Sequence, residues 1–282
     1  MIAYAQLTPG PGWRPLRALL YYVHRLGVAT PVGRALADGI AALLSVAHPP
    51  PGRLKDDALL DQLRRDGYTV VPPLLSDDQI QEMLDCLSHC EPVGNASLAD
   101  YALTDVVNCP QVMELANHPR LLALASSYLG CAPTISTIGI RWSYPSAHTA
   151  AVQSFHRDPD DWKMVKFFTY LTDVAEGAGP HVFVAGTHRD RLPMKAPRYS
   201  DADVAEKYGE RVVRIKGPRG TMFLADTSGV HKGAPAIDGP RLMLEVGYTL
   251  LPVYAFDYRP VTLTRRLGLD KYINRLIVRP AA

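Results

Sequence analysis

The stretch Gln153-Ser154-Phe155-His156-Arg157-Asp158 carries the pattern from which the architecture of this chain is predicted. His156 and Asp158 are two residues apart, and on a β-strand this spacing places both side chains on the same face. An imidazole and a carboxylate directed at one point are two of the three ligands of a facial iron site, which leaves coordination positions open for oxygen chemistry. The third ligand is then expected to be a histidine from a distant strand, and His231 is the best candidate.

Arg241 follows His231 by ten residues and opens the strand-like run Arg241–Leu251. A guanidinium at the start of a strand beside the metal ligands can bind a carboxylate through two parallel hydrogen bonds. The alternative is an ordinary surface arginine after the Gly239-Pro240 turn. The order histidine, aspartate, histidine, arginine is a more specific signal than the His-x-Asp tripeptide alone, because such tripeptides arise by chance.

These residues, in this order, resemble the Fe(II)/2-oxoglutarate dioxygenases, and more narrowly the phytanoyl-CoA dioxygenase family. Further stretches similar to that family lie on both sides of the His-x-Asp motif, at Lys166–Val174, Gly179–His188, Leu63–Pro72 and Leu75–Ile80. The resemblance covers roughly residues 54–251. It implies a mononuclear non-haem iron enzyme whose Fe(II) is held by His156, Asp158 and His231.

The resemblance also implies that 2-oxoglutarate binds the iron while Arg241 pairs with its far carboxylate. An aspartate in the triad occupies the position that non-haem iron halogenases leave to halide, so the implied reaction is O2-dependent hydroxylation of a C–H bond with release of succinate and CO2. The family oxidises lipid-like acyl-CoA esters, small metabolites, natural products and saccharide-linked molecules, and no CoA-specific motif stands out here. Two other functions stay open: a metal cupin dioxygenase that does not use 2-oxoglutarate, and a catalytically silent barrel that acts as a binding protein.

Four further residues are candidates for the 2-oxoglutarate or substrate pocket, namely Arg141, Ser143, Gln153 and Trp162. Arg141 and Ser143 alternate on one face of the strand before the metal motif, so they reach the pocket only if that face is inward. Trp162 is placed to wall the pocket, although a core aromatic residue would give the same pattern.

Other polar residues near the motif are given lesser roles. Lys163 and Lys166 are expected to face solvent, and His148 is a candidate base on the loop before the motif. His181 and His188 are seven residues apart, which puts them on opposite faces of a regular strand. They are therefore a weak metal pair, and His188 is expected to hydrogen-bond a turn.

The composition is that of an ordinary soluble globular chain, with 282 residues, 47% hydrophobic and 21% charged. The net charge of +2 does not call for a nucleic acid partner. The charge is uneven, since residues 1–53 and 254–282 each carry a net +4 and the middle carries −6. Basic ends favour an anionic small-molecule substrate or partner, and solvated surface charge is the alternative. The sequence does not give the oligomeric state.

The four cysteines, Cys86, Cys90, Cys109 and Cys131, include no Cys-x-x-Cys pair, so neither a zinc ribbon nor a thioredoxin-like motif is supported. No secretory signal is evident at the start of the sequence. A reducing, cytoplasmic location is therefore expected.

Helical patterns dominate the first half of the chain and strand patterns the second. Helices are predicted over residues 13–26, 32–46, 54–66, 76–90, 117–130 and 199–209. Strands are predicted at Tyr68–Val71, Thr134–Tyr144, Lys163–Val174, His181–Ala185, Arg211–Ile215, Thr221–Ala225 and Arg241–Leu251. Residues 91–110 are predicted to form a loop near the active-site mouth.

This order indicates an α+β chain whose β part is a jelly roll, a double-stranded β-helix with N-terminal helices packed on it. We expect a helical extension over residues 1–53, an iron and 2-oxoglutarate jelly-roll domain over 54–251, and a basic tail over 252–282.

The two N-terminal helices have two interpretations. Neither reaches the ~20 apolar residues that a membrane span needs. A basic amphipathic helix can lie on an anionic membrane surface, so peripheral membrane contact is one expectation. The other is that these helices pack on the barrel or on a second subunit.

Overall fold

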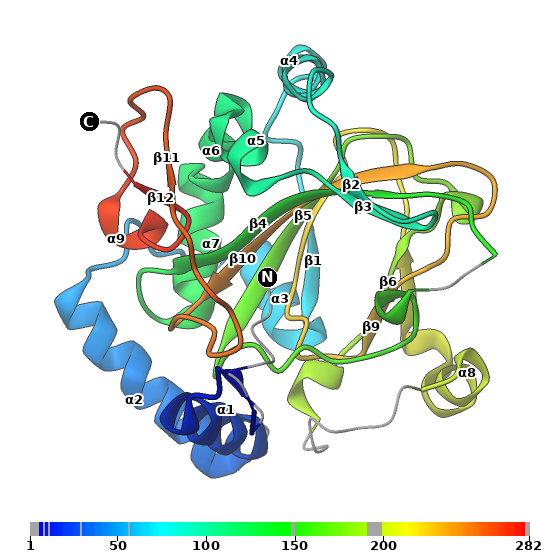
Figure 1. Ribbon diagram of the computed structural model, residues 1–282. Coiled ribbons are helices and arrows are strands. Elements are labelled where there is room, and N and C mark those ends of the chain that lie inside the picture. Colours follow the sequence, from blue (N-terminus) through cyan, green and yellow to red (C-terminus); the bar gives the residue numbers. More distant parts are fainter. Residues whose placement is uncertain are drawn as a thin grey trace.

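Two antiparallel sheets face each other at the centre of the molecule, and helices cover the outer face of the larger sheet (Figure 1). The computed structural model describes residues 6–7, 9–10, 12–28, 30–55, 57–147, 150–190 and 199–279. His148 lies outside the described residues. The mixed helix and sheet composition and the two facing sheets confirm the expected fold class.

The larger sheet has the strand order β1-β8-β5-β10-β4-β3-β2. Its strands are β1 (Tyr68–Val71), β2 (Val93–Gly94), β3 (Leu98–Asp100), β4 (Thr134–Ser143), β5 (Met164–Tyr170), β8 (Met222–Ala225) and β10 (Arg241–Thr249). The long strand β10 lies between β4 and β5 and pairs with both, so that Arg241 stands opposite Ser143 and Gly247 stands opposite Lys166. The strand predictions for this sheet are confirmed to within a few residues at each end.

The smaller sheet has the order β7-β6-β9, with β6 at His181–Val184, β7 at Val212–Ile215 and β9 at His231–Gly233. A single bridge between His156 and His231 adds the metal-motif segment to its edge. Between the two sheets lies a buried aromatic cluster, with Phe168, Tyr170 and Phe223 from the larger sheet and Phe183 from the smaller. This cluster fixes how the two sheets face each other.

Both faces of the larger sheet are buried, and the alternation of side chains decides which face each residue takes. On β5, Val165 and Phe167 join the main apolar core on the helix side, whereas Phe168 and Tyr170 enter the cluster between the sheets. The helices on the outer face are α3 (Ala58–Asp66), α4 (Asp77–Leu87), α5 (Leu103–Asn108), α6 (Pro110–Ala116) and α7 (Pro119–Leu129).

Local capping explains where these helices begin and end. Ser76 accepts a hydrogen bond from the Gln79 backbone N–H, and the Gln79 side chain accepts one from the Ser76 N–H, which completes a capping box at the start of α4. Helix α3 begins at the Asp57 cap and ends at Gly67, which adopts a positive φ of 83°. Glycine is the residue best suited to that left-handed position.

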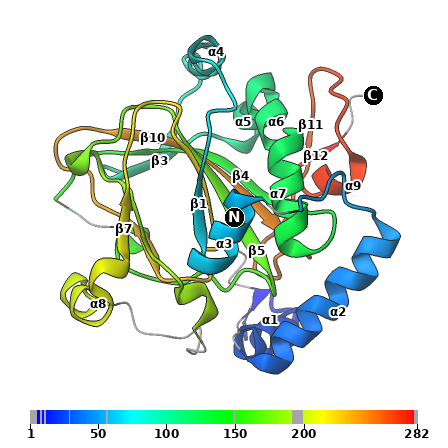
Figure 2. The same cartoon turned by 180° about the vertical axis from the view of Figure 1, so that it is seen from behind.

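The N-terminal helices α1 (Pro15–Gly27) and α2 (Pro31–Ala47) lie against one corner of the molecule, as Figure 2 shows from behind. Ala37 and Ala41 of α2 belong to the main apolar core. These helices therefore pack on the β body, as expected. Among the described helices none alone is long and apolar enough to cross a membrane, although α1 and α2, bent by 115°, pass that test when taken as a pair.

Three parts of the chain differ from the expectation. Residues 91–110 are not a loop, since they contain β2, β3 and α5. Strand β9 was not predicted, because three residues are too short to show a period. The C-terminal tail, in which no strand was predicted, contains two short parallel strands, β11 (Val261–Thr262) and β12 (Val278–Arg279), with helix α9 (Lys271–Asn274) between them. The helix predicted over residues 199–209 is present as α8 (Asp201–Tyr208).

Candidate metal centre

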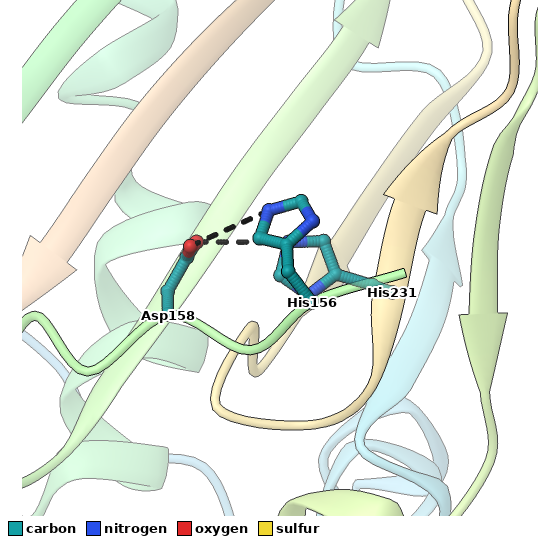
Figure 3. A group of neighbouring side chains, drawn as sticks. All are labelled: His156, Asp158 and His231. Carbon is teal, nitrogen blue, oxygen red and sulfur yellow. Dashed lines mark ion pairs between the residues drawn. The ribbon is translucent and has the colours of Figure 1, made fainter. Parts of the chain in front are cut away.

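His156, Asp158 and His231 converge between the two sheets (Figure 3). The backbones of His156 and His231 exchange two hydrogen bonds of 2.9 Å, and the Asp158 N–H donates to the Thr227 carbonyl at 2.8 Å. This pairing brings together ligands that are 75 positions apart in the chain. The Nε2 atoms of both histidines lie 3.6 Å from carboxylate oxygens of Asp158, and the three ligand atoms all lie within 4.8 Å of one another.

Both imidazoles are oriented by the same local device. The Nδ1 of His156 lies 2.8 Å from the Ser154 carbonyl, and the Nδ1 of His231 lies 3.0 Å from the Gly229 carbonyl. A carbonyl only accepts, so each Nδ1 carries the proton and each Nε2 offers its lone pair to the centre of the site. Burial lowers the pKa of His231 to about 3, so this ring is neutral and ready to bind a metal at neutral pH.

Lys166 lies inside the site, which corrects the expectation that it faces solvent. Its ammonium donates to Asp158 Oδ2 at 2.9 Å and lies 3.1 Å from Glu245 Oε1 and 3.5 Å from Asp160 Oδ2. Because both faces of β5 are buried, a polar residue on this strand has no solvated side to take. Lys163 points to the outer surface and pairs with Asp38.

The buried charges of Asp158 and Lys166 stabilise each other. Burial opposes ionisation of Asp158, yet the Lys166 ammonium holds the pKa of that carboxyl well below its usual range. Burial also opposes the charge on Lys166, but Asp158, Glu245 and Asp160 together keep its pKa well above the ordinary value. Asp158 is therefore a carboxylate that is ready to ligate a cation.

Arg241 is a buried guanidinium that has no carboxylate partner among the described residues. Its side chain donates to the Ser143 hydroxyl at 3.1 Å and to the Gly179 carbonyl, and its Nε has no hydrogen-bond partner. Only 5% of the residue is exposed. Burial lowers the pKa of Arg241, but a guanidinium stays charged in proteins. A buried cation of this kind is stabilised by an anionic ligand.

One cavity of about 420 Å³ connects Arg241 with the three metal-binding residues. It is lined by four of the five predicted 2-oxoglutarate or substrate residues, namely Arg241, Arg141, Ser143 and Gln153. Arg141 is engaged by Asp100 through two contacts of 2.6 and 3.0 Å. The side-chain Oε1 of Gln153 accepts a hydrogen bond from the Ala150 N–H at 2.6 Å. Gln153 therefore shapes the wall of the cavity through a turn.

Trp162 does not line this cavity, which corrects its predicted role. It lies in a neighbouring cavity of about 270 Å³, and its ring packs edge-on against His24 of α1 at 4.8 Å. The ring lies so close to Gly27 and Gly33 that a side chain at either position would press against it. Trp162 is a docking residue for the N-terminal helices because the chain turns away from the metal between Asp158 and β5.

His181, which was predicted to be part of only a weak metal pair, lies in the site. It lines the metal cavity, and its ring stacks on His231 with the centroids 5.6 Å apart. Burial holds its pKa well below the usual value, and its Nε2 has no hydrogen-bond partner. His188 lies away from the metal and contacts the Arg64 carbonyl at 3.2 Å, as expected for a residue that binds a turn.

The donor set fits a mononuclear iron site. Two imidazoles and one carboxylate, all lining one cavity, match the facial arrangement of non-haem Fe(II). The buried guanidinium in the same cavity fits the distant carboxylate of a dicarboxylic acid. Among the described residues, none from the basic ends, 1–53 and 254–279, lines this cavity, so the uneven charge of the chain does not act at its wall.

Comparison with protein families gives one match. The family model described as phytanoyl-CoA dioxygenase (PhyH) matches residues 63–239, which is more than half of the chain. The match includes all three metal-binding residues and stops two positions before Arg241. No curated protein sequence matches the chain.

Three solved structures with similar folds illustrate the likeness. The epimerase SnoN, in complex with Fe3+, alpha ketoglutarate and nogalamycin RO, is 25% identical, with a TM-score of 0.51 over 67% of this chain and 81% of that one. HygX from Streptomyces hygroscopicus, with nickel, 2-oxoglutarate and hygromycin B bound, is 15% identical, with a TM-score of 0.56 over 76% and 93%. EctD from S. alaskensis with bound Fe is 19% identical, with a TM-score of 0.55 over 83% and 93%. The last two likenesses concern the fold, a double-stranded β-helix.

Proposed function

The chain belongs to the phytanoyl-CoA dioxygenase family of iron- and 2-oxoglutarate-dependent oxygenases, and from this premise we propose that it hydroxylates a C–H bond of a polar small molecule. Succinate and CO2 are the expected co-products. The observation that carries the proposal is the pairing, in one cavity, of a facial metal triad with a buried arginine that has no carboxylate partner among the described residues.

The proposed roles follow from the geometry. His156, Asp158 and His231 hold the metal, and Arg241 with the Ser143 hydroxyl binds the far carboxylate of 2-oxoglutarate. When bound, iron and 2-oxoglutarate supply the activation of O2 and the oxidising equivalents for the C–H bond. The protein supplies position and a water-poor cavity, and the Lys166 ammonium keeps Asp158 ionised before the metal arrives.

The substrate class is inferred from the part of the cavity beyond the metal. Charged groups lie on this wall, with the Asp100–Arg141 pair on one side and Glu245 beside Lys166 on the other. Such a wall suits a substrate with several hydroxyl or amino groups better than a long acyl chain, because burying these charges against a hydrocarbon leaves them unsolvated. SnoN and HygX were solved with nogalamycin RO and hygromycin B respectively, which supports a saccharide-linked or similarly polar substrate.

The direct test is a turnover assay with purified, Fe(II)-loaded protein. We expect succinate formation from 2-oxoglutarate, increased by a substrate from a panel of glycosides and aminoglycosides, with one product heavier by one oxygen atom. A matched panel of acyl-CoA esters serves as the comparison. Stimulation by acyl-CoA alone would contradict the polar-substrate proposal, and absence of succinate under every condition would contradict the enzymatic one.

A further inference from the structure

The N-terminal helices turn their large apolar side chains outward. Eleven of the fifteen large hydrophobic residues that the described chain exposes lie between Trp13 and Val46. Leu26, Val32 and Val46 are each more than three-quarters exposed. We call the following set the outer helix face: Leu16, Leu19, Leu20, Val23 and Leu26 of α1, with Val32, Leu36, Leu43 and Val46 of α2.

The inward sides of the same helices are built mainly from small residues. Helix α1 buries Ala18, Tyr21 and His24, and α2 buries Gly33, Ala37 and Ala41. A helix that served only to cover the β body would direct its leucines inward. Ile40 and Leu44 of α2 do pack against the core, but most of the large apolar side chains of the two helices are exposed, so the apolar stripe has a use other than packing within this chain.

Exposed apolar residues that are scattered singly are normal on a soluble monomer, whereas a concentration of them marks a contact surface, and here most of them lie on two consecutive helices. The two helices that carry the outer helix face lie together at one corner of the molecule in both views (Figures 1 and 2). The outer helix face therefore has the character of a contact surface. Its charges indicate what it contacts.

The charged residues on these two helices are almost all basic. Arg14 precedes α1, Arg25 lies within it, and Asp38 of α2 is already paired with Lys163. In the first turn of α2, Arg34 donates a hydrogen bond to the Arg189 carbonyl at 2.8 Å. Residues 1–53 carry five arginines against Asp38 alone, so the region that contains the two helices is basic.

The cavity next to these helices has mixed charge. Arg34 and Arg189 line this space of about 270 Å³ together with Arg64 and Arg157, and also with Asp161, Asp190 and Asp226. The excess of positive charge therefore belongs to the helical region itself, residues 1–53. A second copy of this chain would bring the same basic helices against each other, whereas an anionic surface would complement them.

We propose that α1 and α2 dock this protein on an anionic phospholipid surface, with both helices lying at the headgroup boundary. Neither helix alone can span a membrane, and an amphipathic helix with a basic polar side lies in the interface plane. Trp13 and Tyr22 are half exposed beside the apolar face, and such rings favour the membrane–water boundary. The proposal does not depend on the chemistry of the metal site.

The test is co-sedimentation of the full-length protein with vesicles of phosphatidylcholine alone or with one quarter phosphatidylglycerol. We expect binding to the anionic vesicles that weakens in 0.5 M salt, because surface charge is screened over a few ångströms at that ionic strength. The variant Leu19→Gln, Val23→Gln and Leu26→Gln should reduce partitioning at least about tenfold, since it removes one apolar stripe. Arg14→Gln with Arg25→Gln should reduce the preference for anionic over neutral vesicles.

The matched control is Val93→Gln with Ile237→Gln. These residues are 76% and 72% exposed but lie on the β body, so their loss should leave vesicle binding unchanged. Light scattering of each protein in solution gives its oligomeric state and so tests whether a second copy of the chain covers the outer helix face instead. The proposal is overturned if the wild type does not sediment with anionic vesicles, or if the α1 variant binds them as the wild type does. A wild-type dimer that the α1 variant converts to monomer, without vesicle binding, would assign the face to a second copy instead.

Discussion

Replacing Arg241 with methionine should separate ligand binding from folding. The guanidinium is 5% exposed and bonds only to the Ser143 hydroxyl and the Gly179 carbonyl. Its removal relieves the desolvation of a buried charge, which costs several kcal/mol in proteins. It also leaves two polar groups unpaired, at about 1–3 kcal/mol each. These terms oppose each other, so we expect the free energy of unfolding of the ligand-free protein to change by less than about 2 kcal/mol.

Binding of 2-oxoglutarate should change far more. Truncating one partner of a buried charge pair costs about 2–5 kcal/mol, which corresponds to an increase in Kd of roughly 30-fold to 4,000-fold. At a ligand concentration of 100 Kd for the wild type, bound ligand stabilises the fold by about 2.7 kcal/mol. In the Arg241→Met variant at the same concentration, this stabilisation should fall below about 0.9 kcal/mol.

The assay is urea denaturation with and without 2-oxoglutarate, with Mn2+ present in place of iron. Arg141→Met is the matched control, because Arg141 lines the same cavity but is already paired with Asp100, and it should keep the full stabilisation by ligand. Arg241→Lys should recover part of the effect, since an ammonium cannot form the two parallel bonds of a guanidinium. If 2-oxoglutarate stabilises the Arg241→Met variant as much as the wild type, or if only the Arg141→Met variant loses the effect, the assigned role of Arg241 is wrong.

Three further outcomes follow from the site and its surroundings. His156→Ala should abolish divalent metal binding in isothermal titration while the far-ultraviolet circular dichroism is unchanged, and an unchanged metal affinity would remove His156 from the ligand set. Lys166→Met leaves three neighbouring carboxylates without their shared cation, so it should lower the free energy of unfolding of the metal-free protein by about 3–5 kcal/mol in urea denaturation. Mn2+ should stabilise this variant more than it stabilises the wild type. Equal stabilities of the two metal-free proteins would refute this. Burial raises the pKa of Asp161 to about 7 in the folded state, above its value in the unfolded chain. The free energy of unfolding therefore includes the full contribution of protonated Asp161 below about pH 4. It falls by about 1.4 kcal/mol per pH unit as the pH rises from there to 7. Asp161→Asn should flatten that slope, and identical pH profiles of unfolding would contradict the assignment.

Local patterns were enough to predict most of the β body. Strands β4, β5 and β10 were predicted within a few residues because β-branched and aromatic runs between turn residues are a property of short segments. The candidate metal ligands were predicted for a different reason: imidazole and carboxylate side chains are the ligands that the chemistry requires, and their order along the chain is visible without a structure. Their convergence is confirmed by the 3.6 Å contacts to Asp158.

The direction that a side chain takes was harder to predict than the element that carries it. Lys166 was expected to face solvent because lysine usually does, but β5 is covered by helices on one face and by the smaller sheet on the other. Trp162 was placed at the metal by its distance in sequence from Asp158, and the chain turns between them. Strand β9 is too short to show a period, and it exists because it pairs with β6.

The sequence by itself therefore determined the chemistry available to this protein, because ligand types and strand-forming runs are local properties. Only the tertiary structure decided which groups contact the candidate metal ligands and which side chains are buried. It placed the Lys166 ammonium against Asp158 and left Arg241 buried without a carboxylate. It also turned the leucines of α1 outward, since periodicity reveals that a helix has an apolar side but not whether that side meets the body of the protein or something beyond it.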